Sequence, residues 1–284
     1  MGNESMLHHF YLFLLAALQG VTELFPISSL GHSILVPALF RWPINRDASW
    51  FLPFIVVLHL GTLVALLSFF WRDWVELIGA FLRDRGRPRS AETRLLWLLI
   101  LASIPAGLLG LALAHRIKDL FGGFGFAAVA LMVNGVLLIW GDRLRAREPS
   151  HTLEKLSWGR ALIIGFAQSL ALIPGFSRSG ATLVAGIGVG LDYANSARFS
   201  FLLATPIIGA AGLLEVPKLA HQHLSHGLYG VIVLSGIISA IFAWFSVWFL
   251  MRYFHQHEIK ALRPFGIYCI LFGAFALLVG NGGL

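Results

Sequence analysis

The fold is decided by a polar interruption within an apolar stretch, Gln19-Gly-Val-Thr-Glu23-Leu-Phe-Pro26-Ile-Ser28-Ser29-Leu-Gly31-His32. It places a carboxylate, two hydroxyls and an imidazole inside a chain in which 57% of the residues are hydrophobic and 12% are charged. The mean hydropathy of +0.78 lies outside the range of soluble domains and indicates an integral membrane protein. Because ionisable groups are costly at membrane depth, this segment is a candidate functional site.

A membrane-spanning helix needs about 20 mostly apolar residues, and six segments meet or approach that length. They are roughly 50–71, 95–114, 124–140, 198–216, 228–250 and 264–280. Two further apolar stretches, 7–36 and 160–190, are each broken near the middle by proline, glycine and serine. Non-helical backbone survives at membrane depth only inside protein or beside a polar cavity, so each stretch is predicted to form a re-entrant helical hairpin. For the first stretch, one kinked helix is the alternative.

The net charge of +7 follows the predicted topology and does not indicate a nucleic-acid partner. Fourteen lysines and arginines fall in the loops after the first, third and fifth spans, against five in the opposite loops. The positive-inside rule places the richer side in the cytoplasm and both termini outside. The run of arginines from Arg83 to Arg94 can also contact anionic lipid headgroups, although an orientation signal with no binding role is the favoured interpretation.

The two broken stretches align with each other at an offset of 149 residues. The matched pairs are Gln19 with Gln168, Ser28 with Ser177, and Gly31 with Gly180. Each stretch is followed by three spans, and because three is odd the second copy begins on the other side of the membrane. We therefore predict one membrane domain of two inverted repeats, about 7–140 and 160–280, whose hairpins meet near the midplane. The alternative is a coincidental match between two hairpins rich in glycine and serine.

The first hairpin supplies groups for a cation and for an anion. Gln19 and Glu23 are four residues apart, so they share a helix face and can present two oxygens to a divalent cation. Ser28 and Ser29 follow a proline as natural N-cap residues of a second half-helix, and His32 lies one turn further on. The N-terminus of such a half-helix offers free N–H groups and a positive dipole end to an anion.

The second hairpin carries Pro174-Gly-Phe-Ser177-Arg178-Ser179-Gly180 at the equivalent turn. Arg178 lies between two hydroxyls, and arginine is the side chain best suited to hold phosphate oxygens bidentately. A carboxylate, an arginine, hydroxyls and a histidine together indicate metal-assisted phosphoryl transfer. Each element also has a simpler interpretation, because serines often cap helices and Glu23 with Arg178 can form a structural ion pair between the hairpins.

The other histidines are interpreted as structural. His59 lies inside the first span and is expected to be a satisfied polar residue at a helix contact. His221, His223 and His226 are expected to form a solvated outer loop.

These motifs resemble the undecaprenyl-diphosphate phosphatase family, also known as the bacitracin-resistance protein family. The resemblance covers essentially the whole chain and rests on residues 19–32, on Leu172-Ile-Pro174-Gly-Phe-Ser177-Arg178-Ser179-Gly180-Ala-Thr182, and on Phe199-Ser-Phe-Leu-Leu-Ala204. It implies an enzyme of the bacterial inner membrane that hydrolyses undecaprenyl diphosphate to the monophosphate and inorganic phosphate. This reaction recycles the lipid carrier of peptidoglycan and other envelope polymers. A Mg²⁺ or Ca²⁺ ion, homodimers, reduced sensitivity to bacitracin and a site open to the outer face are further implications.

The chain departs from the family pattern at two positions. Gln19 stands where the motif allows glutamate or glutamine, which leaves one charge fewer for the cation, and Leu30 replaces a small hydroxyl residue of many members. We expect Glu23, with Gln19, to hold the cation against the diphosphate. The phosphate is then expected to be bound by residues of the second hairpin: Ser177, Arg178, Ser179 and Gly180.

The nucleophile stays open at this point. Ser28 or Ser29 can attack with His32 as general base, or His32 can itself attack or activate water. A transporter or flippase for a phosphorylated lipid or a small anion is the alternative function, because inverted repeats with broken helices are typical of transporters. A pure transporter has little need of a base beside two hydroxyls, so His32 is the residue that discriminates between the two.

Overall fold

The computed structural model describes residues 2–46, 48, 50–121, 123–144, 152–220, 226–257 and 259–280. Within these residues it contains eleven α-helices, two short 3₁₀ helices and no strand, which confirms the all-α prediction. The α-helices are α1 (Gly2–Leu24), α2 (Ser29–Leu39), α3 (Phe51–Phe69), α4 (Trp71–Arg83), α5 (Ala91–Phe121), α6 (Phe124–Leu144), α7 (Trp158–Gln168), α8 (Arg178–Gly188), α9 (Tyr193–Ala220), α10 (His226–Gln256) and α11 (Arg263–Gly280). The 3₁₀ helices are η1 (Leu153–Lys155) and η2 (Ser169–Leu172). The loop assigned to His221 and His223, and the side chain of His226, lie outside the described residues.

Six of these helices are long and apolar enough to cross a membrane. They are α3, α5, α6, α9, α10 and α11, and each corresponds to one predicted span in the same order. Large apolar side chains project outward from them, for example Leu213 at 80% and Leu278 at 79% exposure. A surface of this kind is stable in lipid and not in water. The chain is therefore a multi-pass membrane protein.

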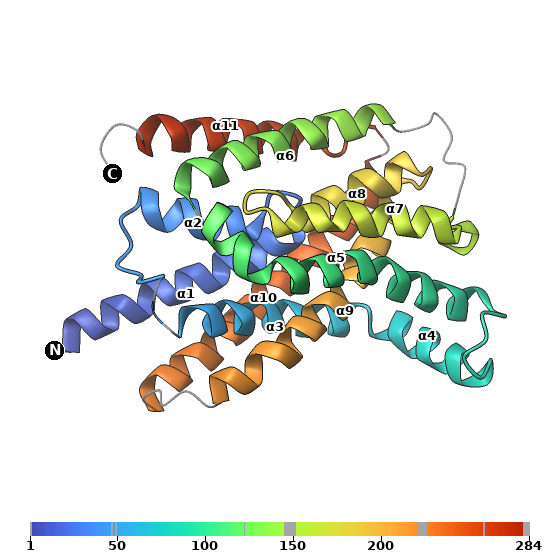
Figure 1. Ribbon diagram of the computed structural model, residues 1–284, viewed down its shortest axis with the longest axis horizontal. Coiled ribbons are helices and arrows are strands. Elements are labelled where there is room, and N and C mark those ends of the chain that lie inside the picture. The colour runs from blue at the N-terminus through green and yellow to red at the C-terminus, as the bar shows by residue number, and fades with distance from the viewer. Residues whose placement is uncertain are drawn as a thin grey trace.

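The two broken stretches each form two helices joined by a turn that reverses the chain direction. Residues 25–28 separate α1 from α2, and residues 169–177 separate α7 from α8. In Figure 1, α1 and α2 lie on the left and α7 and α8 on the right, and the two turns approach each other at the centre. The first stretch is thus a hairpin and not one kinked helix. Its re-entrant depth in a bilayer stays a prediction.

The helices pack in pairs that correspond between the two halves of the chain. α3 packs against α10, and the counterpart of α3, α9, packs against α5. Likewise α1 packs against α10 while α7 packs against α5, and α6 lies along α11 at the top of Figure 1. This exchange of partners is the packing that inverted repeats produce. It supports the two predicted repeats, whose bounds at about 7–140 and 160–280 stay a prediction.

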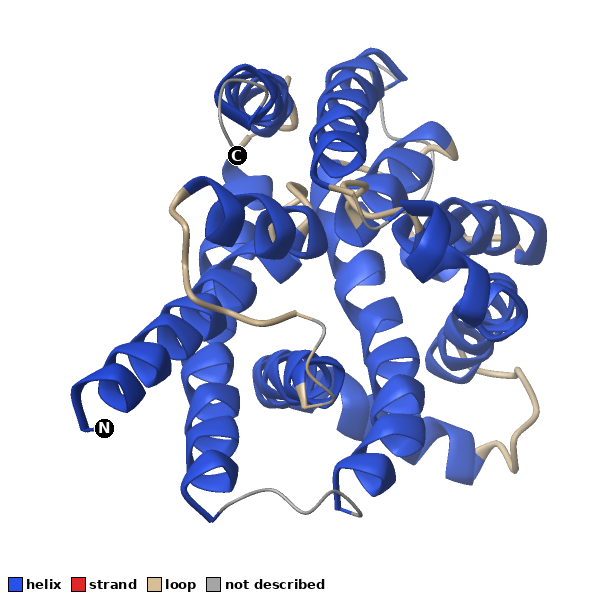
Figure 2. Cartoon of the chain, turned by 60° about the vertical axis from the view of Figure 1, so that its left-hand side comes forward, coloured by secondary structure: helices blue, strands red, loops and turns tan. Residues whose placement is uncertain are grey.

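Two of these crossings depend on glycine. A Cβ atom at Gly61 of α3 would collide with the carbonyl oxygen of Gly236 on α10, and one at Gly135 of α6 would collide with that of Gly266 on α11. Helices in lipid associate largely through close van der Waals packing, which small residues permit. These contacts fix α3 and α6, the two spans that bring His59 and Asn134 to the hairpin turns. Figure 2 shows that the described chain consists of helices and connecting loops.

Candidate active site

Both hairpins begin their second helix with a serine cap. Ser28 Oγ accepts a hydrogen bond from the Gly31 N–H at 3.2 Å, and Ser177 Oγ accepts one from the Gly180 N–H at 3.1 Å. These residues are the pairs matched at the offset of 149, so the repeat pattern did locate equivalent structural positions. The two turns touch, because a Cβ atom at Gly180 would lie 3.2 Å from the Pro26 carbonyl oxygen.

Asn134 on α6 ties the two turns together. Its Nδ2 donates to the Pro26 carbonyl at 3.0 Å, and its Oδ1 accepts from the Ser177 N–H at 3.0 Å. Ser179 adds a bond between the hairpins, from its Oγ to the Phe25 carbonyl at 3.0 Å. A fully satisfied buried network of this kind holds one geometry. Asn134 was not among the predicted site residues, although an amide inside an apolar span was a signal.

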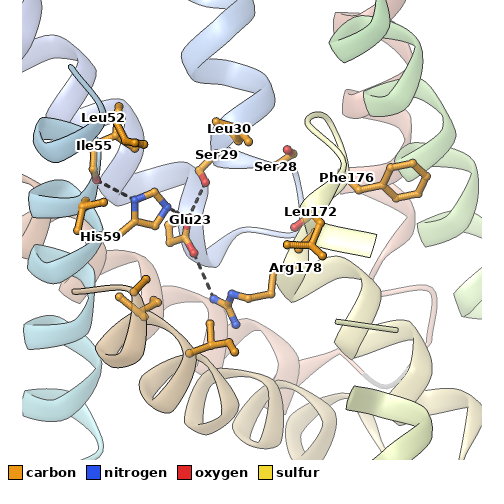
Figure 3. A pocket seen from close by; sticks show the side chains of 16 residues that line it. Glu23, Ser28, Ser29, Leu30, Leu52, Ile55, His59, Leu172, Phe176 and Arg178 are labelled. Atoms are coloured by element: carbon orange, nitrogen blue, oxygen red, sulfur yellow. Dashed lines mark hydrogen bonds and ion pairs between the residues drawn. The ribbon is translucent and has the colours of Figure 1, made fainter. Parts of the chain in front are cut away.

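A cavity of about 470 Å³ opens beside these turns (Figure 3). Its polar lining comes from both hairpins and from α3: Glu23, Ser28, Ser29, His59, Ser177 and Arg178. The remaining wall is apolar and includes Leu52 of α3, Phe176 of the second turn and Ile208 of α9. A few convergent polar groups within an apolar wall suit a ligand that joins a charged head to a hydrocarbon chain.

Glu23 is the centre of the polar end. Its Oε1 lies 3.3 Å from Arg178 Nη2, while its Oε2 accepts hydrogen bonds from Ser29 Oγ at 2.5 Å and from Gln19 Nε2 at 3.0 Å. A buried carboxylate is tolerated at this depth when paired and hydrogen-bonded. The predicted ion pair between the hairpins is therefore present. The second oxygen of its carboxylate accepts the hydrogen bond from the Ser29 hydroxyl.

Arg178 is the first residue of α8 and is held from two sides. Its Nη1 donates to the Ser200 carbonyl at 3.3 Å, and its Nη2 contacts Glu23. Its buried Nε atom has no hydrogen-bond partner within the described residues. An unpaired buried donor costs about 1–3 kcal/mol, and a phosphate group supplies acceptors that a guanidinium binds as a fork. Arg178 thus has unused donor capacity beside the cavity.

His59 of α3 contacts the same carboxylate. Its Nδ1 lies 2.8 Å from the Ile55 carbonyl, and this nitrogen must carry a proton because a carbonyl can only accept. Its Nε2 lies 3.1 Å from Gln19 Nε2 and 3.4 Å from Glu23 Oε2, and in the neutral ring it accepts from Gln19. His59 is satisfied, as predicted, and it also lines the cavity, which the sequence interpretation missed. Glu23 was selected as a site residue because an ionisable group is energetically costly at membrane depth. The same argument applied to His59.

His32 does not line the cavity. Its Nδ1 lies 2.7 Å from the Ser28 carbonyl and its Nε2 lies 2.8 Å from the Tyr268 hydroxyl, while its ring stacks on Phe272 at 5.1 Å between centroids. These contacts connect α2 to α11. The structure therefore does not bring His32 to the carboxylate at the centre of the site, and its predicted role as general base stays a prediction without a supporting contact.

The predicted phosphate-binding residues divide into two groups. Ser177 and Arg178 line the cavity, whereas Ser179 and Gly180 do not. Ser179 is fully buried, and its Oγ lies 3.0 Å from Ser177 Oγ in addition to its bond with the first hairpin. Gly180 contributes its N–H to the helix cap. Ser179 and Gly180 thus stabilise the turn that presents the other two.

The residues at the cavity fit a divalent cation only as part of a complex with a ligand. Glu23 is the single carboxylate in the lining, and the described residues contain no group of three His, Cys, Asp or Glu suited to a metal. Gln19, the predicted second ligand, is buried behind Glu23 and turns its amide nitrogen to it. Since Mg²⁺ is commonly held by one or two carboxylates plus substrate phosphates, Glu23 and phosphate oxygens would hold it here.

This fold and this site define an integral membrane protein whose polar centre is suited to a phosphorylated amphiphile. The chain belongs to the bacitracin resistance protein family, BacA, whose model matches residues 12–275. It is 56% identical over 265 residues to "Undecaprenyl-diphosphatase 2" of Chromobacterium violaceum, covering 93% of this chain and 96% of that protein. It is also 49% identical to "Undecaprenyl-diphosphatase 2" of Burkholderia lata over 269 residues, 94% and 95% of the two chains. A protein of Acidiphilium cryptum named "Undecaprenyl-diphosphatase" is 45% identical over 271 residues, 94% and 96% of the two chains. The family that the motifs resembled is confirmed.

Proposed function

We propose that this protein hydrolyses undecaprenyl diphosphate to undecaprenyl phosphate and inorganic phosphate, which recycles the lipid carrier of envelope synthesis and confers bacitracin resistance. Family membership and relatives that match nearly the full length favour this hydrolase over the transporter alternative. The observation that carries the proposal is the cluster of Ser29, Glu23 and Arg178 at the polar end of an apolar cavity. It joins a hydroxyl, a proton acceptor and a phosphate-binding guanidinium within hydrogen-bond distance.

Ser29 is the proposed nucleophile and Glu23 its general base, because their oxygen atoms are 2.5 Å apart, within the range for direct proton transfer. Ser29 Oγ attacks the terminal phosphorus and its proton passes to Glu23. The bond from that phosphorus to the bridging oxygen breaks, so undecaprenyl phosphate leaves with the electron pair. Water then attacks the phosphoserine, the serine oxygen recovers its proton from Glu23, and inorganic phosphate is released.

Arg178 and Ser177 bind the terminal phosphate during both steps. The guanidinium stabilises the negative charge on the transferred group, as positively charged clamps do in phosphoryl transfer generally. Glu23, together with phosphate oxygens of the substrate, would hold a divalent cation, Mg²⁺ or Ca²⁺, which would neutralise part of the diphosphate charge when bound. The apolar wall receives the first part of the prenyl chain, and the remainder extends into lipid.

The proposed location is the bacterial inner membrane, with the arginine-rich loops in the cytoplasm and the cavity open to the outer side. The charge distribution supports this orientation. The cavity residues of α3, Leu52 to His59, belong to the half of that helix opposite its arginine-rich end. A homodimer is part of the same proposal, and its mass in detergent is the test.

The test is phosphate release from a long-chain prenyl diphosphate by the purified protein, with and without EDTA. Glu23→Gln and Arg178→Ala should abolish release in folded protein, and EDTA should suppress it. His32→Gln, which keeps a polar contact to Tyr268, should retain most of the activity because His32 does not line the cavity. No release from folded wild-type protein across cations and lipids would move the transporter alternative to first place.

A further inference from the structure

α4 carries a stripe of large apolar side chains that no other part of the described chain covers. The stripe consists of Trp71, Val75, Ile78 and Leu82, which are 55%, 61%, 51% and 69% exposed. Their spacing of four, three and four residues places them on one helix face. At about 100° per residue, this face lies opposite the buried Leu77 and Ala80, on the side of α4 that packs on α5. One face of α4 thus meets protein and the opposite face meets the surroundings.

α4 lies at one end of the membrane-spanning helices. A single residue, Phe70, separates it from α3, and in Figure 1 it extends beyond the right-hand end of α3. Its first turn is anchored because Asp73 forms an ion pair with Arg198 near the start of α9. An apolar stripe in this place would be unfavourable in water, whereas an amphipathic helix in the membrane interface buries such a face by about 5–10 Å.

Exposed arginines lie beside the first residue of the stripe and at the turn that follows α4. They are Arg72, Arg83, Arg85, Arg87 and Arg89. The guanidinium carbon of Arg72 lies 5.4 Å from the ring centre of Trp71, at the edge of the stripe. The side chains of Arg83, Arg85 and Arg87 have no hydrogen bond or ion pair with the described residues. These guanidinium groups are therefore available to an external anion.

Arg94, which belongs to the same run in the sequence, has a different role. Its guanidinium donates to the carbonyls of Glu154 at 3.1 Å and Leu156 at 2.7 Å. It fastens the segment before α7 to α5. Arg94 is therefore a structural residue, whereas Arg83, Arg85 and Arg87 are free. The sequence alone did not distinguish between them.

The turn that presents the free arginines is held in one shape. Asp84 Oδ2 accepts hydrogen bonds from the Ser90 N–H, the Ser90 hydroxyl and the Thr93 hydroxyl at 3.0, 2.6 and 2.8 Å. Trp97 Nε1 donates to the Gly86 carbonyl at 2.8 Å. Because three donors engage Asp84 Oδ2, this carboxylate holds the turn in one conformation, and among the exposed arginines it is Arg89 whose charge acts on it.

We propose that α4 and the turn 83–89 form a binding surface for the anionic phospholipids of the leaflet on the arginine-rich side. The apolar stripe lies among the acyl chains, and the free guanidinium groups bind the headgroup phosphates. This surface is separate from the cavity between the hairpins. The proposal does not depend on the hydrolytic activity.

The first test measures lipid binding by native mass spectrometry of the purified full-length protein in neutral detergent with phosphatidylglycerol added. The triple variant Arg83→Gln, Arg85→Gln, Arg87→Gln is compared with a matched control, Arg252→Gln, Lys260→Gln, Arg263→Gln. The control removes the same charge from exposed positions of another loop on the same side. Each arginine near an anionic surface is worth about a factor of five in affinity, so we expect a loss on the order of 100-fold in the first variant only. Equal losses in both variants, or none in the first, would overturn the proposal.

The second test asks what covers the stripe. Spin labels are placed at Ile78→Cys in the stripe and at Glu76→Cys, an exposed position about 130° from the stripe around the helix, in a Cys269→Ala background that removes the single, buried cysteine. In phosphatidylglycerol vesicles we expect the label at position 78 to be accessible to lipid-soluble oxygen and the label at 76 to a water-soluble nickel reagent. Water accessibility at both positions, or a spin–spin distance at position 78 showing that a second copy covers the stripe, would contradict the proposal.

Discussion

The neighbouring serines of the first hairpin give a prediction that tests the proposed chemistry directly. Ser28 and Ser29 both line the cavity, but Ser28 caps α2 through Gly31 while Ser29 donates to Glu23. Ser29→Ala removes the proposed nucleophile, so kcat should fall on the order of 10⁴-fold or more, as in other enzymes that lose one. It also removes a hydrogen bond to a charged group, which lowers the unfolding free energy by about 1.5–3 kcal/mol.

Ser28→Ala is the matched control, because it changes the adjacent hydroxyl. Loss of an N-cap costs about 1 kcal/mol, so this variant should be less stable than wild type and yet turn over within about tenfold of it. The assay is phosphate release with kcat and KM measured separately, together with thermal unfolding in the same detergent. Substrate labelled in its terminal phosphate, quenched with acid during turnover, should leave label on Ser29.

Two outcomes would contradict the assignment of Ser29 as nucleophile. Turnover by Ser29→Ala close to that of wild type, beside an inactive Ser28→Ala, would assign the attack to the other serine. Label recovered on His32 would exclude both serines, and it would require that the contact with Tyr268 is broken in the active state.

Three further predictions concern the surroundings of the site. Arg178→Lys keeps the positive charge but loses bidentate hydrogen bonding to phosphate oxygens. kcat/KM should therefore fall on the order of 10²-fold or more in the phosphate-release assay. His59→Phe should lower kcat by about tenfold because a polar neighbour of Glu23 is lost, whereas His59→Gln should retain most of the activity; equal effects of the two changes would assign His59 to packing alone. In the α4–α5 turn, hydrogen bonds from Ser90 and Thr93 hold the pKa of Asp84 below its usual value. A lowered pKa stabilises the fold above the unfolded pKa, and this is lost as pH falls through the folded value. Asp84→Asn should therefore lower the melting temperature at pH 7 and have little effect once the carboxyl is protonated in the wild type.

The fold could be predicted from the sequence because the bilayer restricts the choice. Hydropathy located α3, α5, α6, α9, α10 and α11, since only a helix can cross lipid with its backbone satisfied. The hairpin turns were located by proline, glycine and serine, and the offset of 149 residues paired the caps correctly. α4 was not expected as a helix, because its 13 residues are too few to span a membrane and Arg72, Asp73 and Glu76 interrupt its apolar sequence.

The site was predictable only where its residues are close together in the sequence. Gln19, Glu23 and Ser29 lie within one motif, and the structure joins them by hydrogen bonds. His59 and Asn134 reach the site from spans 36 and more than 100 residues beyond Glu23, and local spacing does not determine which face of a span meets the hairpins. His32 is the opposite case, because it is close to Ser28 in the sequence but does not line the cavity. Its contacts with Tyr268 and Phe272 of α11 determine where its side chain points.

The two repeats contribute opposite charges to one centre, and this asymmetry has a consequence for binding. At the offset of 149, Ser29 corresponds to Arg178 and Glu23 corresponds to Leu172, so neither hairpin carries the whole ion pair. Without substrate, the Glu23 carboxylate forms an ion pair with Arg178 Nη2. An incoming diphosphate must compete with Glu23 for this guanidinium.

Glu23→Gln should therefore separate binding from turnover. The substitution keeps a hydrogen-bonding group for Ser29 but removes the competing charge, so a non-hydrolysable prenyl diphosphate should bind more tightly than to wild type. Loss of one hydrogen bond to a charged group is worth about 1.5–3 kcal/mol, which corresponds to a gain on the order of 10–100-fold, measured by calorimetry in EDTA. Turnover should be lost in the same variant. If binding in EDTA is instead weakened, Glu23 attracts the headgroup and does not compete with it. If binding is weakened only when Mg²⁺ is present, the carboxylate acts through the cation, and the proposed ligand role of Glu23 outweighs its competition for Arg178.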